Sequence, residues 1–141
     1  MIRVHGTSVA LGGEGFLLRG PSGCGKSDLA LRLVDEGAFL VADDQTELEV
    51  SGKEIVMRAP ASIAGQIEVR GLGIVRVPSI AEAPLRLVVD LVPACEVERL
   101  PEPRSCLLLE RRVPLVALAP FEASVAAKLR LALKVAEAVT P

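Results

Sequence analysis

The chain has 141 residues, half of them hydrophobic, and a formal net charge of −2. A chain of this length and composition buries enough surface to fold without metal or disulfide staples, so we expect one domain over residues 1–141. The low net charge, the lack of a dense Lys/Arg tract and the absence of Trp and Tyr argue against nucleic acid or an anionic membrane as the main partner.

The most apolar stretch, Val113–Phe121, is too short to cross a bilayer, and no signal peptide is evident at the N-terminus. Cys24, Cys95 and Cys106 lack paired spacing, which suits a reducing compartment and argues against a structural zinc site made of cysteines alone. We therefore expect a soluble, cytoplasmic protein.

The first predicted elements are two short strands. Val4–Leu11 and Gly15–Arg19 are apolar runs that flank Gly12-Gly13-Glu14, a sequence typical of a hairpin turn. The second strand leads directly into a glycine-rich segment that begins at Gly20.

A helix and a further strand follow that segment. Leu29, Leu33 and Val34 recur at helical spacing, and Gly37 is a typical residue just beyond a helix end. The apolar run Phe39–Ala42 predicts a strand that ends in two adjacent aspartates.

The middle of the chain predicts a second hairpin, Thr46–Val50 with Glu54–Arg58, and then a segment without clear periodicity. Ala59–Gly73 is rich in small residues, so we expect a functional loop rather than a core element there. Four more short strands are predicted: Ile74–Val77, Leu85–Val92, Leu107–Leu109 and Leu115–Leu118.

The C-terminal segment from about Phe121 to Val139 predicts an amphipathic helix. Its apolar stripe is formed by Val125, Leu129, Ala132, Ala136 and Val139. Strands and helices of these lengths indicate an α/β fold, a mixed sheet with flanking helices.

The segment from Gly20 to Ser27 reads G-x-x-x-x-G-K-S between a predicted strand and a predicted helix, which is the context of a phosphate-binding loop. Its backbone N–H groups can surround an anion at the positive end of the helix. Lys26 can reach the β- and γ-phosphates of ATP, and the Ser27 hydroxyl can hold Mg²⁺. The expected ATP and phosphate contacts come from Gly20, Pro21, Ser22, Gly23, Cys24, Gly25, Lys26, Ser27 and Asp28.

Asp43 and Asp44 lie at a strand end one helix after this loop, where a carboxylate can complete Mg²⁺ ligation or activate a nucleophile. Adjacent side chains on an extended segment point to opposite sides, so the two carboxylates can divide these tasks; a solvated turn is the alternative. His5, the one histidine, is by itself more typical of a structural residue than of a catalytic one. Cys24 either fits the loop as a small side chain or has a pKa lowered by the helix dipole and Lys26.

Four segments together resemble the catalytic domain of HPr kinase/phosphorylase. They are His5-Gly6, Gly20–Asp28, Leu40-Val41-Ala42-Asp43-Asp44 and the signature-like run Glu68-Val69-Arg70-Gly71-Leu72-Gly73-Ile74. The resemblance extends from about Val4 to Val77 and is weaker beyond. It implies the fold class shared by HPr kinase and phosphoenolpyruvate carboxykinase, a mixed sheet around a phosphate-binding loop.

The resemblance also implies an activity: phosphorylation of the regulatory serine of HPr, the carrier of the sugar phosphotransferase system, with reversal by inorganic phosphate. Asp43 becomes the base toward the acceptor serine and the acid in the reverse reaction, and Asp44 assists at the metal or the acceptor. Lys26 and Ser27 handle phosphates and Mg²⁺, and His5 tunes Asp43. Where HPr and nucleotide meet, the site is lined by Glu68, Val69, Arg70, Gly71, Leu72 and Gly73.

The chain departs from the family pattern in two places. Nothing in it corresponds to the N-terminal regulatory domain of longer members, which puts metabolite control in doubt. Near Val113-Pro114-Leu115 those members continue into Gly-Arg-Asn, whereas this chain reads Val116 to Pro120 without an arginine, so reverse phosphorolysis is expected to be weak unless Arg111 or Arg112 replaces that arginine in space.

Two other functions remain open. The phosphate loop does not specify the acceptor, so a small-molecule kinase is one alternative, although no arginine-rich lid is obvious. A nucleotide sensor without catalysis is the other. The family's members are commonly hexameric, which implies a homo-oligomer, and the terminal helix could serve that contact.

Overall fold

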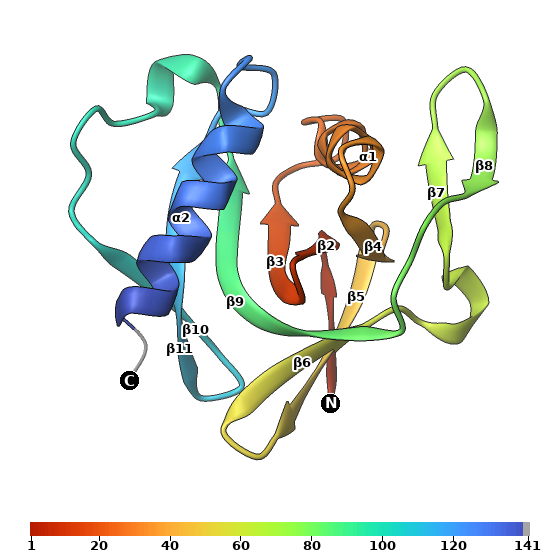
Figure 1. The fold of residues 1–141 in the computed structure, drawn as a ribbon, viewed down its shortest axis with the longest axis horizontal. Coiled ribbons are helices and arrows are strands. Elements are labelled where there is room, and N and C mark those ends of the chain that lie inside the picture. The colour runs from red at the N-terminus through yellow and green to blue at the C-terminus, as the bar shows by residue number, and fades with distance from the viewer. Residues whose placement is uncertain (140–141) are drawn as a thin grey trace.

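The computed structural model describes the backbone of residues 1–139 and the side chains of residues 1–136, with the elements arranged as in Figure 1. The two helices are α1 (Lys26–Asp35) and α2 (Val125–Val139). The N-terminal half holds the strands β1 (Ile2–His5), β2 (Thr7–Leu11), β3 (Glu14–Arg19), β4 (Phe39–Ala42), β5 (Gln45–Ser51), β6 (Glu54–Arg58) and β7 (Gln66–Val69). The remaining strands are β8 (Gly73–Arg76), β9 (Glu82–Leu91), β10 (Arg104–Leu108) and β11 (Arg111–Leu118).

Nine of the described strands form one mixed sheet, in which β9 is the central element. The first half of β9 pairs antiparallel with β6, and its second half lies parallel to β3 on one side and to β11 on the other. The order continues from β3 through β2 to β4, while β6 continues through β5 to β1. The C-terminal ends of β3, β9 and β11 therefore meet at one edge of the sheet, which is the usual place for a ligand site in such folds.

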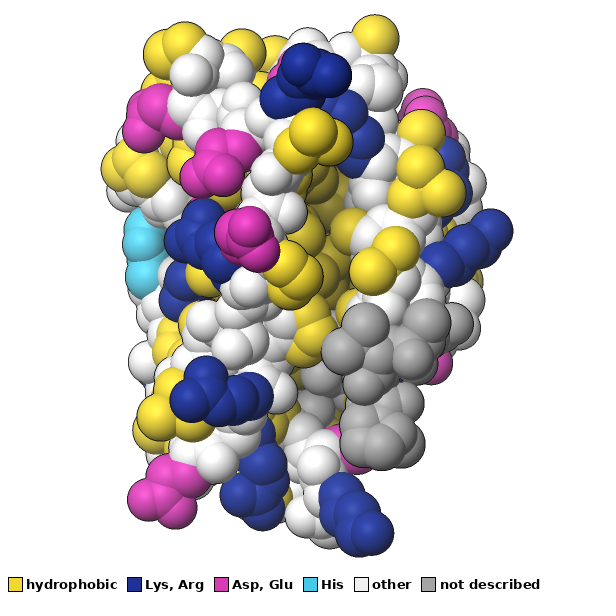
Figure 2. All heavy atoms as spheres, turned by 90° about the vertical axis from the view of Figure 1, so that its left-hand side faces the viewer, with side chains coloured by type: hydrophobic (Ala, Val, Ile, Leu, Met, Phe, Trp, Pro, Cys, Tyr) yellow, Lys and Arg dark blue, Asp and Glu magenta, His cyan; other side chains and the backbone are white. Residues whose placement is uncertain are grey.

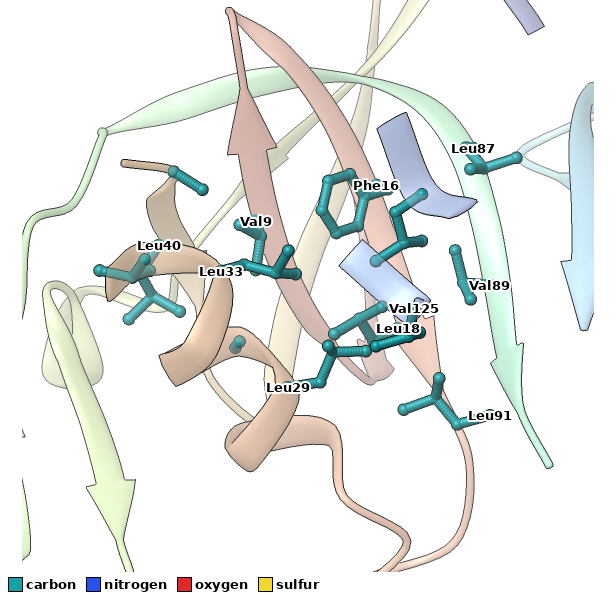
Figure 3. Close-up of a cluster of buried hydrophobic side chains, with 14 of the residues drawn as sticks. Val9, Phe16, Leu18, Leu29, Leu33, Leu40, Leu87, Val89, Leu91 and Val125 are labelled. Atoms are coloured by element: carbon teal, nitrogen blue, oxygen red, sulfur yellow. The ribbon is translucent and has the colours of Figure 1, made fainter. Parts of the chain in front are cut away.

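The sheet has an apolar core on each face. On one face, Leu29 of α1 and Val125 of α2 share a cluster of buried side chains with Phe16 and Leu18 of β3, all of which are labelled in Figure 3. The second core includes Leu17 and Val88, and the curved hairpin of β5 and β6 covers it with Leu48 and Met57. Because successive residues of a strand point to opposite faces, Leu17 and Leu18 belong to different cores.

The predicted amphipathic helix at the C-terminal end of the chain is confirmed as α2. Val125 and Leu129 on the predicted stripe of α2 are buried, whereas the side chain of Val139 lies outside the described residues. The helix begins at Val125, so Phe121 precedes it and is exposed. Figure 2 views the side of the molecule that carries α2, where hydrophobic side chains line a hollow.

The predicted strand Val4–Leu11 is in fact two strands that break at Gly6. The Gly6 N–H donates to the carbonyl of Asp44 at 2.8 Å, and the chain changes partners there: β1 pairs with β5, and β2 with β3 and β4. A Cβ on Gly6 would lie 2.8 Å from Leu17 Cδ1 and 3.0 Å from the backbone oxygen of Leu18, so the crossing leaves little room for a side chain. The residues on both sides of Gly6 suit extended strands, so the local sequence gave no sign of this change of partner.

The expectation that Ala59–Gly73 contains no core element is wrong. The segment includes β7, which pairs with β8, and Ile67 on β7 is only 1% exposed against the core beneath α1. Only one residue of this short strand is fully buried, so its sequence carried no periodic signal. The β10–β11 hairpin is also longer than predicted, because its polar residues lie on exposed positions of the sheet.

No helix in the described part of the chain combines the length and the apolar character needed to span a membrane.

Candidate active site

The site is built around the loop from Gly20 to Ser27, which joins β3 to α1 at the C-terminal edge of the sheet (Figure 1). Gly25 immediately precedes the helix with φ +108°, and a Cβ there would lie 2.8 Å from Cζ of Phe121. Both the backbone conformation and the close approach of the ring require glycine at this position. The N-terminal amides of α1 are thereby left facing the loop, where an anion binds favourably.

Lys26 is the first residue of α1, and its side chain returns over the loop. Its Nζ donates to the carbonyl oxygens of Gly20 at 2.6 Å and Pro21 at 3.0 Å, and lies 3.9 Å from Sγ of Cys24. The residue is only 6% exposed. A lysine ammonium has three N–H donors, and here two are donated to carbonyl oxygens and the third to the weak acceptor Sγ of Cys24, so a positive charge is held at the loop.

Asp43, directly after β4, is the centre of the polar network. It is 8% exposed, and its Oδ1 accepts hydrogen bonds from Ser27 Oγ at 2.6 Å and Thr7 Oγ1 at 3.2 Å. Its Oδ2 accepts from the backbone N–H of Glu68 at 3.0 Å. One carboxylate thus joins the phosphate loop, the start of β2 and the strand that carries the signature-like segment.

Asp44 contacts His5 rather than Ser27. Its Oδ1 lies 2.9 Å from Nε2 of His5, and both side chains are well exposed. The partner of His5 is therefore Asp44, not Asp43 as expected. Asp44 has φ +67°, a strained conformation for a residue with a side chain, and its N–H donates to Thr7 Oγ1 at 3.1 Å.

The sequence interpretation missed Thr7. Its fully buried hydroxyl donates to Asp43 and accepts from the Asp44 N–H, so it sets the positions of both aspartates. Threonine is a common residue in strands, and its place two residues after His5 carries no spacing signal of its own. Only the packing of β2 against β4 shows the role of this hydroxyl.

The signature-like segment forms the β7–β8 hairpin at the border of the site. Glu68 and Val69 end β7, Gly73 begins β8, and the turn between them is closed by the Leu72 N–H, which donates to Val69 O at 3.0 Å. The side chains of Arg70 and Leu72 are exposed at this turn. The hairpin contacts Asp43 through its backbone and presents its side chains to solvent.

The remaining predicted residues are placed less centrally. Asp28 Oδ2 accepts from Arg32 Nε at 3.0 Å along α1. Arg111 and Arg112 lie at the start of β11, the end of the strand remote from the loop, so within one chain they do not replace the missing arginine.

Arg19 and Asp90 form an ion pair with two hydrogen bonds, Nε–Oδ1 at 2.8 Å and Nη2–Oδ2 at 3.2 Å, that joins the ends of β3 and β9. The hydrogen bonds to Asp90 raise the pKa of the Arg19 guanidinium.

The oxygen donors beside the loop fit Mg²⁺. Ser27 Oγ and the Asp43 carboxylate lie within 2.6 Å of each other, and hydroxyl and carboxylate oxygens are hard ligands that Mg²⁺ accepts. No group of three or more His, Cys, Asp or Glu is clustered for a metal ion among the described residues. Magnesium at nucleotide sites does not require one, because phosphate oxygens and water complete its shell.

The chain matches the family model of the HPr serine kinase C-terminal domain over residues 1–97. An HPr kinase/phosphorylase from Caldicellulosiruptor bescii is 51% identical over 77 residues, 54% of this chain and 25% of that protein. One from Mycoplasmopsis pulmonis is 38% identical over 96 residues, 68% of this chain and 29% of that protein. The chain thus covers about a quarter of the length of these curated relatives.

The fold has a solved counterpart. The structure of the Hpr(Ser) kinase/phosphatase from Coxiella burnetii superposes with a TM-score of 0.81 at 24% identity, covering 98% of this chain and 90% of that one. This likeness extends over β10, β11 and α2, which lie beyond the residues that the family model matches. The phosphate-loop motif, the paired aspartates and the signature-like segment all lie within the matched residues, and the chain belongs to the HPr serine kinase C-terminal domain family.

Proposed function

We propose that this protein transfers the γ-phosphoryl group of Mg-ATP to the regulatory serine of HPr, and that reversal by inorganic phosphate is weak because neither Arg111 nor Arg112 lies beside the loop within one chain. The observation that carries the proposal is the 2.6 Å contact between Ser27 Oγ and Asp43 Oδ1. It places a carboxylate directly beside the residue expected to lie at the terminal phosphates. Family membership supports HPr as the acceptor.

Lys26 and Ser27 would bind the terminal phosphates and the metal. The Lys26 ammonium is held at the loop by two carbonyls and would stabilise charge on the transferred phosphoryl group. Ser27 Oγ would ligate Mg²⁺, with the Asp43 carboxylate adjacent to it. When bound there, Mg²⁺ would supply charge neutralisation at the β- and γ-phosphates.

Asp43 would act as the general base. A carboxylate has about four acceptor positions, and protein donors fill two on Oδ1 and one on Oδ2. The remaining position on Oδ2 can accept the hydrogen bond of the acceptor serine. As the serine oxygen forms its bond to phosphorus and ADP leaves, the serine proton passes to Asp43. In the reverse direction the same proton returns to the serine oxygen while inorganic phosphate attacks, giving pyrophosphate.

His5 and Asp44 would face the incoming protein. Their contact at 2.9 Å lies on the exposed side of the site, so the pair can orient the acceptor segment without contacting Ser27. The exposed hairpin turn at Arg70 would provide a second contact with HPr. In this arrangement Asp44 acts toward the acceptor rather than the metal.

The test is incubation of the protein with Mg-ATP and the HPr of the same organism, followed by mass-spectrometric mapping of the phosphorylated residue. We expect one phosphoserine on HPr, lost in Lys26→Ala and retained in Lys53→Ala, a control lysine on the exposed β5–β6 turn. ATP binding without transfer would instead indicate a sensor. Transfer to metabolites but not to HPr would indicate a small-molecule kinase.

The variant Asp43→Asn distinguishes a role of Asp43 as the general base from a role as a ligand of Mg²⁺. We expect transfer in both directions to fall about 10²–10⁴-fold, the range for loss of a general base, while Mg-ATP binding largely persists. If Asp43→Asn abolishes Mg-ATP binding, Asp43 is mainly a metal ligand and the base is Asp44. Asp44→Asn is the matched comparison.

A further inference from the structure

A pocket of about 720 Å³ opens beside the phosphate loop and is not used by the reaction described above. Three chain segments form it: Pro21–Cys24 of the loop, residues 91–96 from the last residue of β9 onward, and residues 119–122 before α2. All three lie at the same edge of the sheet in Figure 1. The last segment falls outside the residues that the family model matches.

The wall before α2 is fixed against the loop. Pro120 and the ring of Phe121 abut Gly25, where a Cβ would lie 3.3 Å from Pro120 Cβ and 2.8 Å from Phe121 Cζ. Arg32 of α1 donates a hydrogen bond to Pro120 O, and its guanidinium lies 5.9 Å from the centroid of the Phe121 ring. The pocket is therefore preformed, as small-molecule sites usually are.

The lining suits the uncharged part of a nucleotide. Its apolar surface comes from Leu91, Val92, Pro93 and Pro120. Phe121 also lines the pocket and is 69% exposed, so its ring is available for contact with a ligand, whereas Phe16 is fully buried in the core. The charged groups that line this pocket are the carboxylates of Glu96 and Glu122, the second paired with Lys128 at 2.7 Å. Carboxylates repel phosphate but accept hydrogen bonds from an amino group.

We propose that this pocket binds the purine base of the nucleoside triphosphate, with the ring of Phe121 as a stacking surface. The inference rests on the proposed function, because it needs the triphosphate held by the adjacent loop. The volume is within the range of about 300–1,000 Å³ typical of small-molecule sites. The acidic lining directs the triphosphate toward Lys26 and the base away from it, so the pocket sets both nucleotide preference and orientation.

The experiment compares Mg-ATP with Mg-tripolyphosphate, which has the phosphates but no base or ribose, by calorimetric titration of the full chain. The variants are Phe121→Ala, which removes the stacking surface, and Ala94→Leu, which adds bulk at an exposed residue of the pocket lining. Phe39→Ala is the matched control, since Phe39 is 46% exposed at the start of β4 and does not line the pocket.

For the wild type we expect ATP to bind more tightly than tripolyphosphate and than CTP. Both pocket variants should raise the Kd for ATP at least about fivefold, the low end for loss of base stacking. The Kd for tripolyphosphate should stay within about twofold, and Phe39→Ala should change neither constant. A wild type that binds ATP and tripolyphosphate equally, or pocket variants that weaken both ligands alike, would overturn the base site while leaving the phosphate site intact. A wild type that binds neither ligand would overturn both proposals.

Discussion

Thr7→Val is the substitution that most directly probes how the paired aspartates are positioned. Valine has nearly the shape of threonine, so the fully buried site stays filled while the hydroxyl is removed. Two hydrogen bonds are lost: the one donated to Asp43 Oδ1 at 3.2 Å and the one accepted from the Asp44 N–H at 3.1 Å. The change therefore acts on both aspartates at once.

The structure gives the magnitudes. A hydrogen bond to a charged group contributes about 1.5–3 kcal/mol and a neutral one about 0.5–1.5 kcal/mol, so we expect the free energy of unfolding to fall by roughly 2–4.5 kcal/mol. Asp44 also loses a contact that holds its left-handed backbone in place. Misplacing a catalytic group by about 1 Å can cost 10²-fold in rate, so we expect kcat for transfer to HPr to fall about 10- to 100-fold. KM for ATP should change little, because Lys26 and Ser27 remain.

The chain offers a matched control at Thr46. This threonine is also fully buried, and its hydroxyl also makes two hydrogen bonds, to Ser8 Oγ at 2.9 Å and to Gly6 O at 3.0 Å. Thr46→Val should thus destabilise the protein without a specific loss of kcat. Thr7→Ser, which keeps the hydroxyl, should restore most of the rate.

The measurements are urea unfolding for stability and steady-state phosphorylation of HPr for kcat and KM, at a temperature where all variants are folded. If Thr7→Val keeps the wild-type kcat, the hydroxyl does not position the aspartates. Equal losses of kcat in Thr7→Val and Thr46→Val would likewise assign the effect to stability alone.

Three further outcomes are expected from other parts of the structure. Ile67→Ala should lower the free energy of unfolding by about 2–5 kcal/mol, because this side chain is 1% exposed in the core beneath α1; a loss under about 1 kcal/mol in urea unfolding would contradict its assignment to that core. Arg70→Ala should reduce phosphorylation of HPr while the Kd for ATP stays within a few-fold, and the reverse pattern in paired kinase and binding assays would reject the hairpin as an acceptor contact. Burial raises the pKa of the Cys106 thiol, so at neutral pH iodoacetamide should label exposed Cys95 well before Cys106, as followed by peptide mass spectrometry; faster labelling of Cys106 would refute this order.

Local patterns predicted local structure well. The loop motif, α1 and the hairpin of β2 and β3 could be read from neighbouring residues, because the turn at Gly12-Gly13 and the spacing of Leu29 and Leu33 are short-range signals. The strand β7 was missed because only Ile67 in it is fully buried. The break at Gly6 was missed because two consecutive strands with different partners can follow each other without a turn sequence between them.

The sequence by itself determined the phosphate-loop motif, the position of two carboxylates at a strand end and the family to which the chain belongs, since each rests on contiguous motifs. Tertiary structure decided which of these groups touch. Ser27 contacts Asp43, and His5 contacts Asp44. The Thr7 hydroxyl donates a hydrogen bond to Asp43. Arg112 lies at the start of β11, far from the loop, and the Phe121 ring lies against Gly25. These contacts depend on the order of the strands in the sheet, which follows from the burial of apolar surface over the whole chain. Residues that meet in this way are far apart in the sequence, so no short motif contains them.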